Sequence, residues 1–151
     1  MKKILLIVCF VFMFFISSCS YVRTKTKPEY DYYTISIKDN IKLEQPKIKI
    51  LDTNYYKNEY LDQDSMNKVL DFLNALSENN YVDKDLIKDK KPVFRLYMEF
   101  SEDSYVINIY DENYISIFPN DGDYDEDYIS MNKIYKSLNL FYLCKNYINL
   151  K

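Results

Sequence analysis

An acidic segment late in the chain carries the residues best suited to bind a metal ion. Residues 120–127 read Asn-Asp-Gly-Asp-Tyr-Asp-Glu-Asp. Alternating carboxylates in a loop are oxygen ligands of the kind that Ca²⁺ prefers. The candidate ligands are Asp121, Asp123, Asp125 and Asp127. Counted from Asp121, however, Glu126 occupies the glycine position of an EF-hand loop and Asn132 the final glutamate position. We therefore prefer a solvated loop before a helix, whose N-terminus favours negative charge.

Two copies of a Ser-x-x-Lys spacing offer a possible nucleophile and base. Ser65 and Lys68 form the first copy, and Ser130 and Lys133 the second, each within the sequence Ser-Met-Asn-Lys. The spacing resembles the nucleophile motif of penicillin-binding proteins and serine β-lactamases. Those enzymes also need a Lys-Thr-Gly element and a much longer chain. Helix caps inside a biased composition are the simpler interpretation, although the repeat could also mark a duplicated strand-helix unit.

The chain contains no histidine and only three cysteines. Without histidine, Ser-His-Asp and Cys-His centres and nearly all zinc sites are excluded. Cys9 and Cys19 lie near the N-terminus, so Cys144 has no partner for an internal disulfide and is expected to be a small core residue. No spacing singles out a pair of carboxylates for glycoside hydrolysis. We expect no enzymatic activity and no cofactor.

The N-terminus has the three parts of an export signal. Lys2 and Lys3 precede an unbroken apolar run, Ile4 to Ile16, which is followed by Ser17 and Ser18. Positive charge, an apolar core and small residues are the pattern of a secretory signal peptide. The run is shorter than the roughly 18–20 residues that favour a transmembrane helix. Residues 1–18 are therefore predicted to be removed.

The sequence Ile16-Ser17-Ser18-Cys19 resembles the bacterial lipobox. The resemblance implies that Cys19 receives a diacylglyceryl group and becomes the first residue of the mature protein. Two acyl chains bury enough methylene groups, at about 0.8 kcal/mol each, to hold a domain on a bilayer. We expect a lipid anchor on the extracytoplasmic face of the cell membrane. Residues 19–33 would be the lipidated cysteine and its tether.

Composition limits the partners of the mature protein. Removal of Lys2 and Lys3 leaves 18 basic and 23 acidic residues, a net charge of −5. This charge argues against a nucleic-acid partner, which requires a basic face. The 17 tyrosines either reflect an A/T-rich genome or form an aromatic binding surface. The expected partners are the membrane, through lipid, and another envelope or secreted protein.

Residues 34–151 are predicted to form a single α+β domain. Thr34–Lys38 and Lys47–Leu51 alternate in polarity, which predicts two strands. Asn54–Leu61 is ambiguous between a short strand and a turn. An apolar stripe from Met66 to Leu76, with Asp64 or Ser65 as cap, predicts a helix.

Residues 93–118 predict three antiparallel strands joined by tight polar turns, with one apolar face. A C-terminal helix that starts at Met131, capped by Ser130, would cover that face. The expected architecture is an antiparallel sheet of about five strands with two helices packed on it.

This layout resembles the small uncharacterised lipoproteins of low-GC Gram-positive bacteria. The resemblance rests on the strand at Ile48–Leu51, the helix at Met66–Leu76, Pro92, and the aromatic strands of residues 94–118. It implies a fold and a location but no activity. We expect a membrane-tethered, non-enzymatic module that binds a protein or another ligand. The alternative is an immunity or inhibitor lipoprotein against a secreted enzyme or toxin, and a carboxylate-based envelope hydrolase ranks last.

Overall fold

The computed structural model describes residues 26–119 and 122–149. The signal peptide, Cys19, most of the expected tether and Asp121 lie outside these residues. The described part contains one antiparallel sheet with strand order β2-β1-β3-β4-β5-β6, and three α-helices. The predicted α+β class is therefore confirmed, with six strands and three helices in place of about five and two.

The sheet is built almost entirely from neighbouring antiparallel strands. Its bounds are β1 Lys47–Asp52, β2 Asn58–Tyr60, β3 Phe94–Glu99, β4 Ser104–Ile109, β5 Tyr114–Pro119 and β6 Asp127–Ser130. The three predicted meander strands correspond to β3, β4 and β5, and β6 extends the meander by one strand. The segment described as ambiguous contains both a turn and the short edge strand β2.

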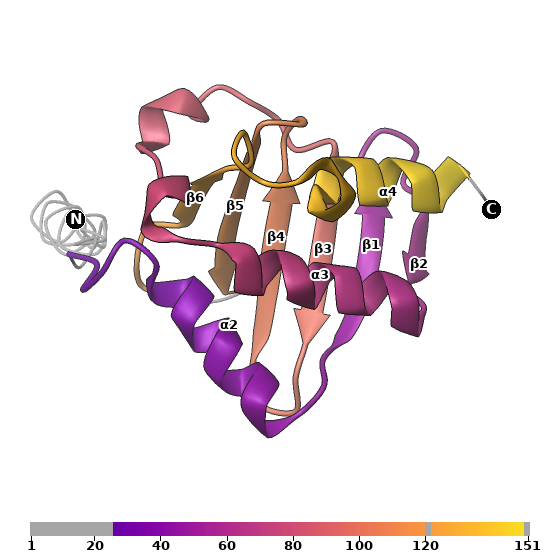
Figure 1. Ribbon diagram of the computed structural model, residues 1–151, viewed down its shortest axis with the longest axis horizontal. Helices are drawn as coiled ribbons and strands as arrows, with labels where there is room; N and C mark the ends of the chain where they lie inside the picture. The colour runs from indigo at the N-terminus through magenta and orange to yellow at the C-terminus, as the bar shows by residue number, and fades with distance from the viewer. Residues whose placement is uncertain (1–25, 120–121, 150–151) are drawn as a thin grey trace, which may run out of the picture.

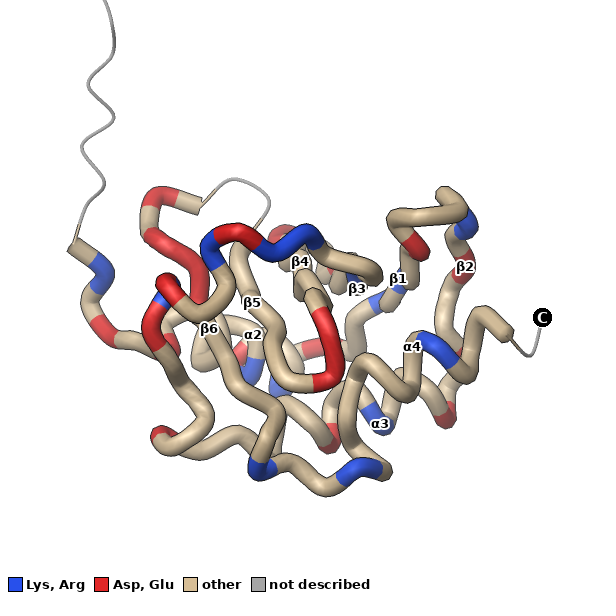
Figure 2. The backbone as a smooth tube through the Cα atoms, turned by 90° about the horizontal axis from the view of Figure 1, so that it is seen from above, with Lys and Arg blue, Asp and Glu red and all other residues tan. Residues whose placement is uncertain are grey.

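All three helices lie on the same face of the sheet (Figures 1 and 2). They are α2 Tyr32–Leu43, α3 Gln63–Ala75 and α4 Leu140–Asn149. The core fills the space between them and the sheet, and it includes Phe94, Leu96 and Met98 of β3 as the alternation predicts. Among the described residues, no helix is both long enough and apolar enough to cross a bilayer. No α-helix of the described residues lies over the opposite face of the sheet.

The predicted strand at Thr34–Lys38 is wrong, because these residues belong to helix α2. Alternation over only five residues is compatible with a strand and with a helix, and only the apolar positions on either side of the five distinguish the two. The helical stripe runs through Tyr33, Ile37 and Ile41 at intervals of four residues, and it packs on the core. Ile35, which the strand pattern placed beside Ile37, is 40% exposed.

The predicted C-terminal helix begins too early. Ser130 is the last residue of β6 and caps no helix, and residues 131–138 form a turn and a short 3₁₀ segment. Helix α4 starts only at Leu140, so Tyr135 is 81% exposed where the helix would have buried it. The two Ser-Met-Asn-Lys copies thus adopt different structures, since Ser65 lies inside α3.

Candidate functional site

The acidic loop does not gather its carboxylates at one point. Asp125 pairs with Lys84 at 2.9 Å on the surface. Asp127, the first residue of β6, is fully buried. In the part of the chain that is described, no three His, Cys, Asp or Glu side chains are placed to share a metal ion. Since Asp121 lies outside that part, the calcium hypothesis stays a sequence prediction.

Asp127 ties the start of helix α2 to the sheet. Its carboxylate accepts hydrogen bonds from the backbone N–H of Tyr33 (3.3 Å) and of Thr34 (2.7 Å), and from the Thr34 hydroxyl (2.8 Å). Lys27 forms an ion pair with the same carboxylate. Burial raises the pKa of Asp127, whereas the bonds from Lys27 and Thr34 act in the opposite direction. A distant strand thus supplies the acceptor that the helix N-terminus needs.

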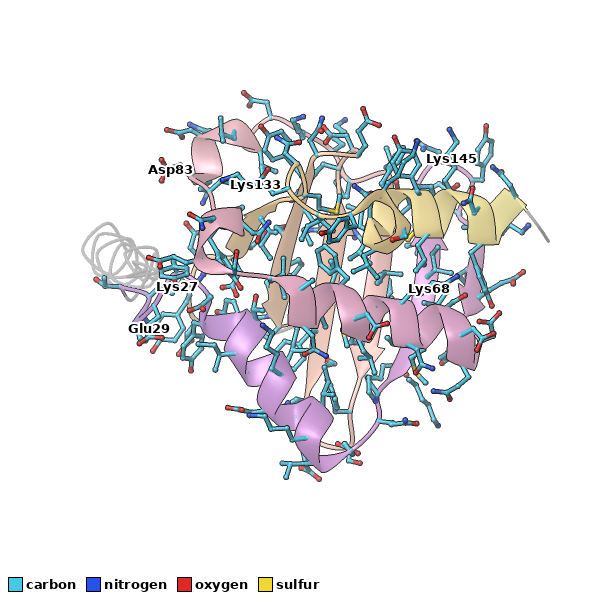
Figure 3. The ribbon with its side chains drawn as sticks, in the orientation of Figure 1. Lys27, Glu29, Lys68, Asp83, Lys133 and Lys145 are labelled. Atoms are coloured by element: carbon cyan, nitrogen blue, oxygen red, sulfur yellow. The ribbon has the colours of Figure 1, made fainter. Side chains whose placement is uncertain are left out.

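The same tie fixes the point where the chain enters the domain. The Lys27 ammonium also donates to the backbone carbonyl of Glu126 at 3.0 Å. Figure 3 shows Lys27 just before α2, on the β6 side of the molecule. Seven residues separate Cys19 from Lys27, which allows a span of at most ~28 Å when fully extended. The tether predicted over residues 19–33 has its last eight residues in the described structure, and α2 already begins at Tyr32.

The other candidate residues from the sequence are the Cys144 thiol and the Ser65–Lys68 pair. Cys144 is completely buried, and burial raises the pKa of its thiol well above the ordinary value. Ser65 and Lys68 line a shallow pocket of about 200 Å³ between α3 and α4, together with Lys136 and Tyr142. The Tyr142 hydroxyl donates to Glu112, and the Lys136 ammonium lies over the Tyr142 ring. Tyr142 and Lys136 therefore already have partners within the fold.

The face of the sheet opposite the helices is lined by polar and aromatic side chains. We call it the open face. It is made of Lys49, Leu51, Arg95, Tyr97, Val106, Asn108, Tyr110, Ser116, Phe118, Glu126 and Tyr128, as the alternation of each strand places them. From the sequence, these positions were predicted only to lie on the face opposite the apolar one.

Four of these residues form a continuous line across the sheet, which we call the polar row. Arg95 lies opposite Asn108, Asn108 opposite Ser116, and Ser116 opposite Tyr128. The Asn108 amide donates to the Ser116 hydroxyl at 3.4 Å, and the Tyr110 hydroxyl lies 3.0 Å from that same oxygen. Although they lie on the face without helices, Asn108 is only 6% exposed and Ser116 is fully buried.

Unpaired polar atoms are concentrated on the open face. Among the described residues, the buried side-chain atoms without a hydrogen-bond partner are Arg95 Nε, Asn108 Oδ1 and Glu126 Oε2. No ion pair to Arg95 forms within the described part of the chain either. A buried polar group without a partner costs about 1–3 kcal/mol. Three such atoms on one face require hydrogen-bond partners from outside the chain, either water or a ligand.

The electrostatics of the open face show that these groups are close together. Burial and the nearby Glu126 carboxylate raise the pKa of Tyr110, whereas Arg95 lowers it. Burial raises the pKa of Tyr128, as do the Asp125 carboxylate, to which its hydroxyl donates at 3.0 Å, and the nearby Glu126 carboxylate. The site therefore combines one guanidinium, one carboxylate, one amide and two phenols.

The loop of residues 83–92 borders the open face at one end of the strands. Lys90 lies 4.8 Å from the centre of the Tyr114 ring, and Lys84 lies 5.9 Å from that of Tyr128. Their ammonium groups pair with Asp111 and Asp125. Ile87 of the same loop is buried but lies outside the main core. The contacts of Lys84 and Lys90 thus hold the loop against the sheet, and the loop forms one border of the open face.

A stability measurement can separate a ligand-binding role of Arg95 from a structural one. We expect Arg95→Met to leave the free energy of unfolding unchanged or to raise it by up to about 1 kcal/mol, because it removes a buried donor that has no acceptor. Urea unfolding of the full chain measures this. A loss of 2 kcal/mol or more would show that Arg95 has a partner within the fold, and would contradict the assignment.

Comparison with known protein families shows which family the chain belongs to. A domain of unknown function, DUF4883, matches residues 27–144. The chain belongs to the DUF4883 family. The match starts at Lys27, the residue that pairs with the Asp127 carboxylate.

One solved structure has a closely similar fold. A crystal structure of a Clostridium perfringens protein, described as a "putative lipoprotein", superposes on this DUF4883 chain with a TM-score of 0.74 at 28% identity. The match covers 82% of this chain and 98% of that one. No curated protein matches. Both findings agree with the resemblance to small uncharacterised lipoproteins of low-GC Gram-positive bacteria, and the DUF4883 family itself has no described activity.

Proposed function

We propose that the protein is a non-enzymatic binding module, held on the outer face of the cell membrane by lipid on Cys19, and that its open face carries the binding. The observation on which this rests is the set of three unpaired buried atoms, on Arg95, Asn108 and Glu126, all on the open face. The likeness to a Clostridium perfringens protein described as a lipoprotein supports the anchored location. With lipid on Cys19, the short span to Lys27 would keep the ligand near the bilayer surface.

Photo-cross-linking in intact cells tests which face is used. A benzophenone amino acid replaces Tyr97 on the open face in one variant, and the exposed Tyr135 on the opposite side in a matched control. We expect cross-linked adducts from position 97, reduced at least tenfold when Arg95→Met is added, and none from position 135. Equal yields from the two positions would contradict the proposal.

A second candidate function, an inhibitor or immunity lipoprotein, is favoured by the tip of the β1–β2 hairpin. Tyr55 and Tyr56 are 82% and 80% exposed, and Tyr56 has a φ of 54°, which is uncommon for a residue other than glycine. The Asp52 carboxylate holds the turn by accepting from the backbone N–H groups of Asn54 and Tyr55 at 2.8 and 3.1 Å. Such a protruding, rigid aromatic tip suits insertion into a cleft of another protein.

The cross-linking experiment separates the two functions. A third variant carries the benzophenone amino acid at Tyr55. Adducts with a protein from position 55, with none from position 97, would favour the inhibitor or immunity function over binding through the open face. Adducts from position 97 alone would exclude the hairpin tip as the contact.

A further inference from the structure

The unpaired atoms of the open face specify what a ligand must offer. Arg95 Nε is a donor and requires an acceptor, whereas Asn108 Oδ1 and Glu126 Oε2 are acceptors and require donors. A simple anion would satisfy Arg95 but be repelled by Glu126, and a simple cation would do the reverse. A ligand whose groups both donate and accept hydrogen bonds satisfies all three.

The strands of the open face carry charges of both signs. Lys47, Lys49 and Arg95 share this face with Glu99, which lies opposite Lys47, and with Glu126. At the border, the ammonium groups of Lys84 and Lys90 pair with Asp125 and Asp111. The strands therefore carry a surplus of one positive charge, which is too small to select a polyanion.

An apolar line runs directly beside the polar row. Tyr97 lies opposite Val106, and Val106 lies opposite Phe118. Val106 is buried although none of the described helices covers it, and the register places the two aromatic residues on either side of it. A ligand that spans both lines needs one apolar surface for the rings and one edge of groups that donate and accept.

We propose that the open face binds a neutral glycan, a deepening of the proposed function that rests on it. A pyranose ring has a C–H surface that packs on aromatic rings, and hydroxyl groups that each donate one hydrogen bond and accept two. Because the unpaired atoms are buried in the free protein, the side chains of Arg95, Asn108 and Glu126 would turn outward to bond to its hydroxyls, while its C–H surface lies on Tyr97 and Phe118.

A peptide fits this face less well. Extended peptides bind by adding a strand to a sheet edge, where backbone groups are available. The described edges offer little of this, since β2 has three residues and β6 is bridged by Tyr81 at Ile129. The unpaired atoms lie instead on side chains, two of them on the central strands β3 and β4 and the third just before the edge strand β6.

Titration with a defined sugar tests the proposal. The full chain is kept in a zwitterionic detergent without a sugar headgroup, and N,N′,N″,N‴-tetraacetylchitotetraose is added while backbone amide NMR signals are followed. We expect shifts at Arg95, Tyr97 and Asn108, and an affinity at least tenfold weaker in Arg95→Met and in Tyr97→Ala. The control Tyr135→Ala should bind as the wild type does.

A blocked tetra-alanine peptide, neutral and of similar size, is titrated in parallel. Shifts on the open face with the peptide but not with the sugar would overturn the glycan inference and leave the proposed binding face intact. Sugar-induced shifts confined to other surfaces, or no shifts at all, would also overturn it. Failure of the binding face itself would appear separately, as equal cross-linking from positions 97 and 135.

Discussion

Replacing Cys19 with alanine is expected to abolish incorporation of radiolabelled palmitate and to release the protein from its lipid anchor. The thiol is the atom that the lipobox resemblance assigns to acylation, and no other residue can take its place there. Two acyl chains hold a protein on a bilayer where one gives only marginal binding. Palmitate labelling of cells that express each variant, followed by immunoprecipitation, measures the first effect. Fractionation measures the second.

The matched control for this experiment is Cys144→Ser. Cys144 is completely buried in the core, so it is not available to an acylating enzyme in the folded protein. This variant should incorporate as much palmitate per molecule as the wild type. Label that persists in Cys19→Ala, or a wild type that takes up none, would contradict the lipid anchor.

The second large effect is expected at Asp127. Asp127→Ala should lower the free energy of unfolding by about 3 kcal/mol, because it removes the acceptor of two backbone N–H groups and one hydroxyl and leaves the Lys27 ammonium, largely buried, without its partner. For a chain of this size the midpoint of thermal unfolding should fall by about 10 °C. Urea and thermal unfolding of the full chain give both quantities.

Asp125→Ala is the control for Asp127→Ala. Asp125 lies two residues away and also pairs with a lysine, but both side chains of the Lys84–Asp125 pair are about half exposed. An exposed pair contributes less than about 1 kcal/mol. Equal losses from the two variants would show that Asp127 does not hold helix α2 to the sheet. A selective loss in Asp127→Ala would locate the effect at the buried tie.

Strictly local patterns predicted much of the fold. The strands β3, β4 and β5 alternate over six residues each and are separated by short polar turns, so their pairing follows from sequence neighbours alone. Helix α3 was predicted within three residues of its start, because its stripe of Met66, Val69 and Leu73 is regular. Its cap is Asp62, whose side chain accepts from the Ser65 N–H, rather than Asp64 or Ser65.

The errors occurred where a distant residue determines the structure. Helix α2 lacks a capping side chain of its own and takes its acceptor from Asp127, more than 90 residues away. The strand β6 was missed for the same reason, because its first inward position is this aspartate, where a strand pattern expects an apolar residue. With β6 unrecognised, the segment that follows was assigned to a helix.

The open face could not be read from the sequence because its character depends on pairing across strands. Arg95 and Asn108 are thirteen residues apart in the chain and become neighbours only through the register of β3 and β4. Glu126 joins them through the unpredicted β6. The number of tyrosines suggested an aromatic surface, and Tyr97, Tyr110 and Tyr128 do lie on one face. Amino-acid composition gave no indication that their polar neighbours Asn108 and Ser116 would be buried.

We propose that Arg95 serves binding rather than folding, and a comparison of two proteins tests this most directly. Wild type and Arg95→Met are compared for the free energy of unfolding and for the yield of cross-linked adducts from position 97 in cells. We expect Arg95→Met to have unchanged or higher stability together with at least a tenfold lower yield. Lower stability together with an unchanged yield would contradict it.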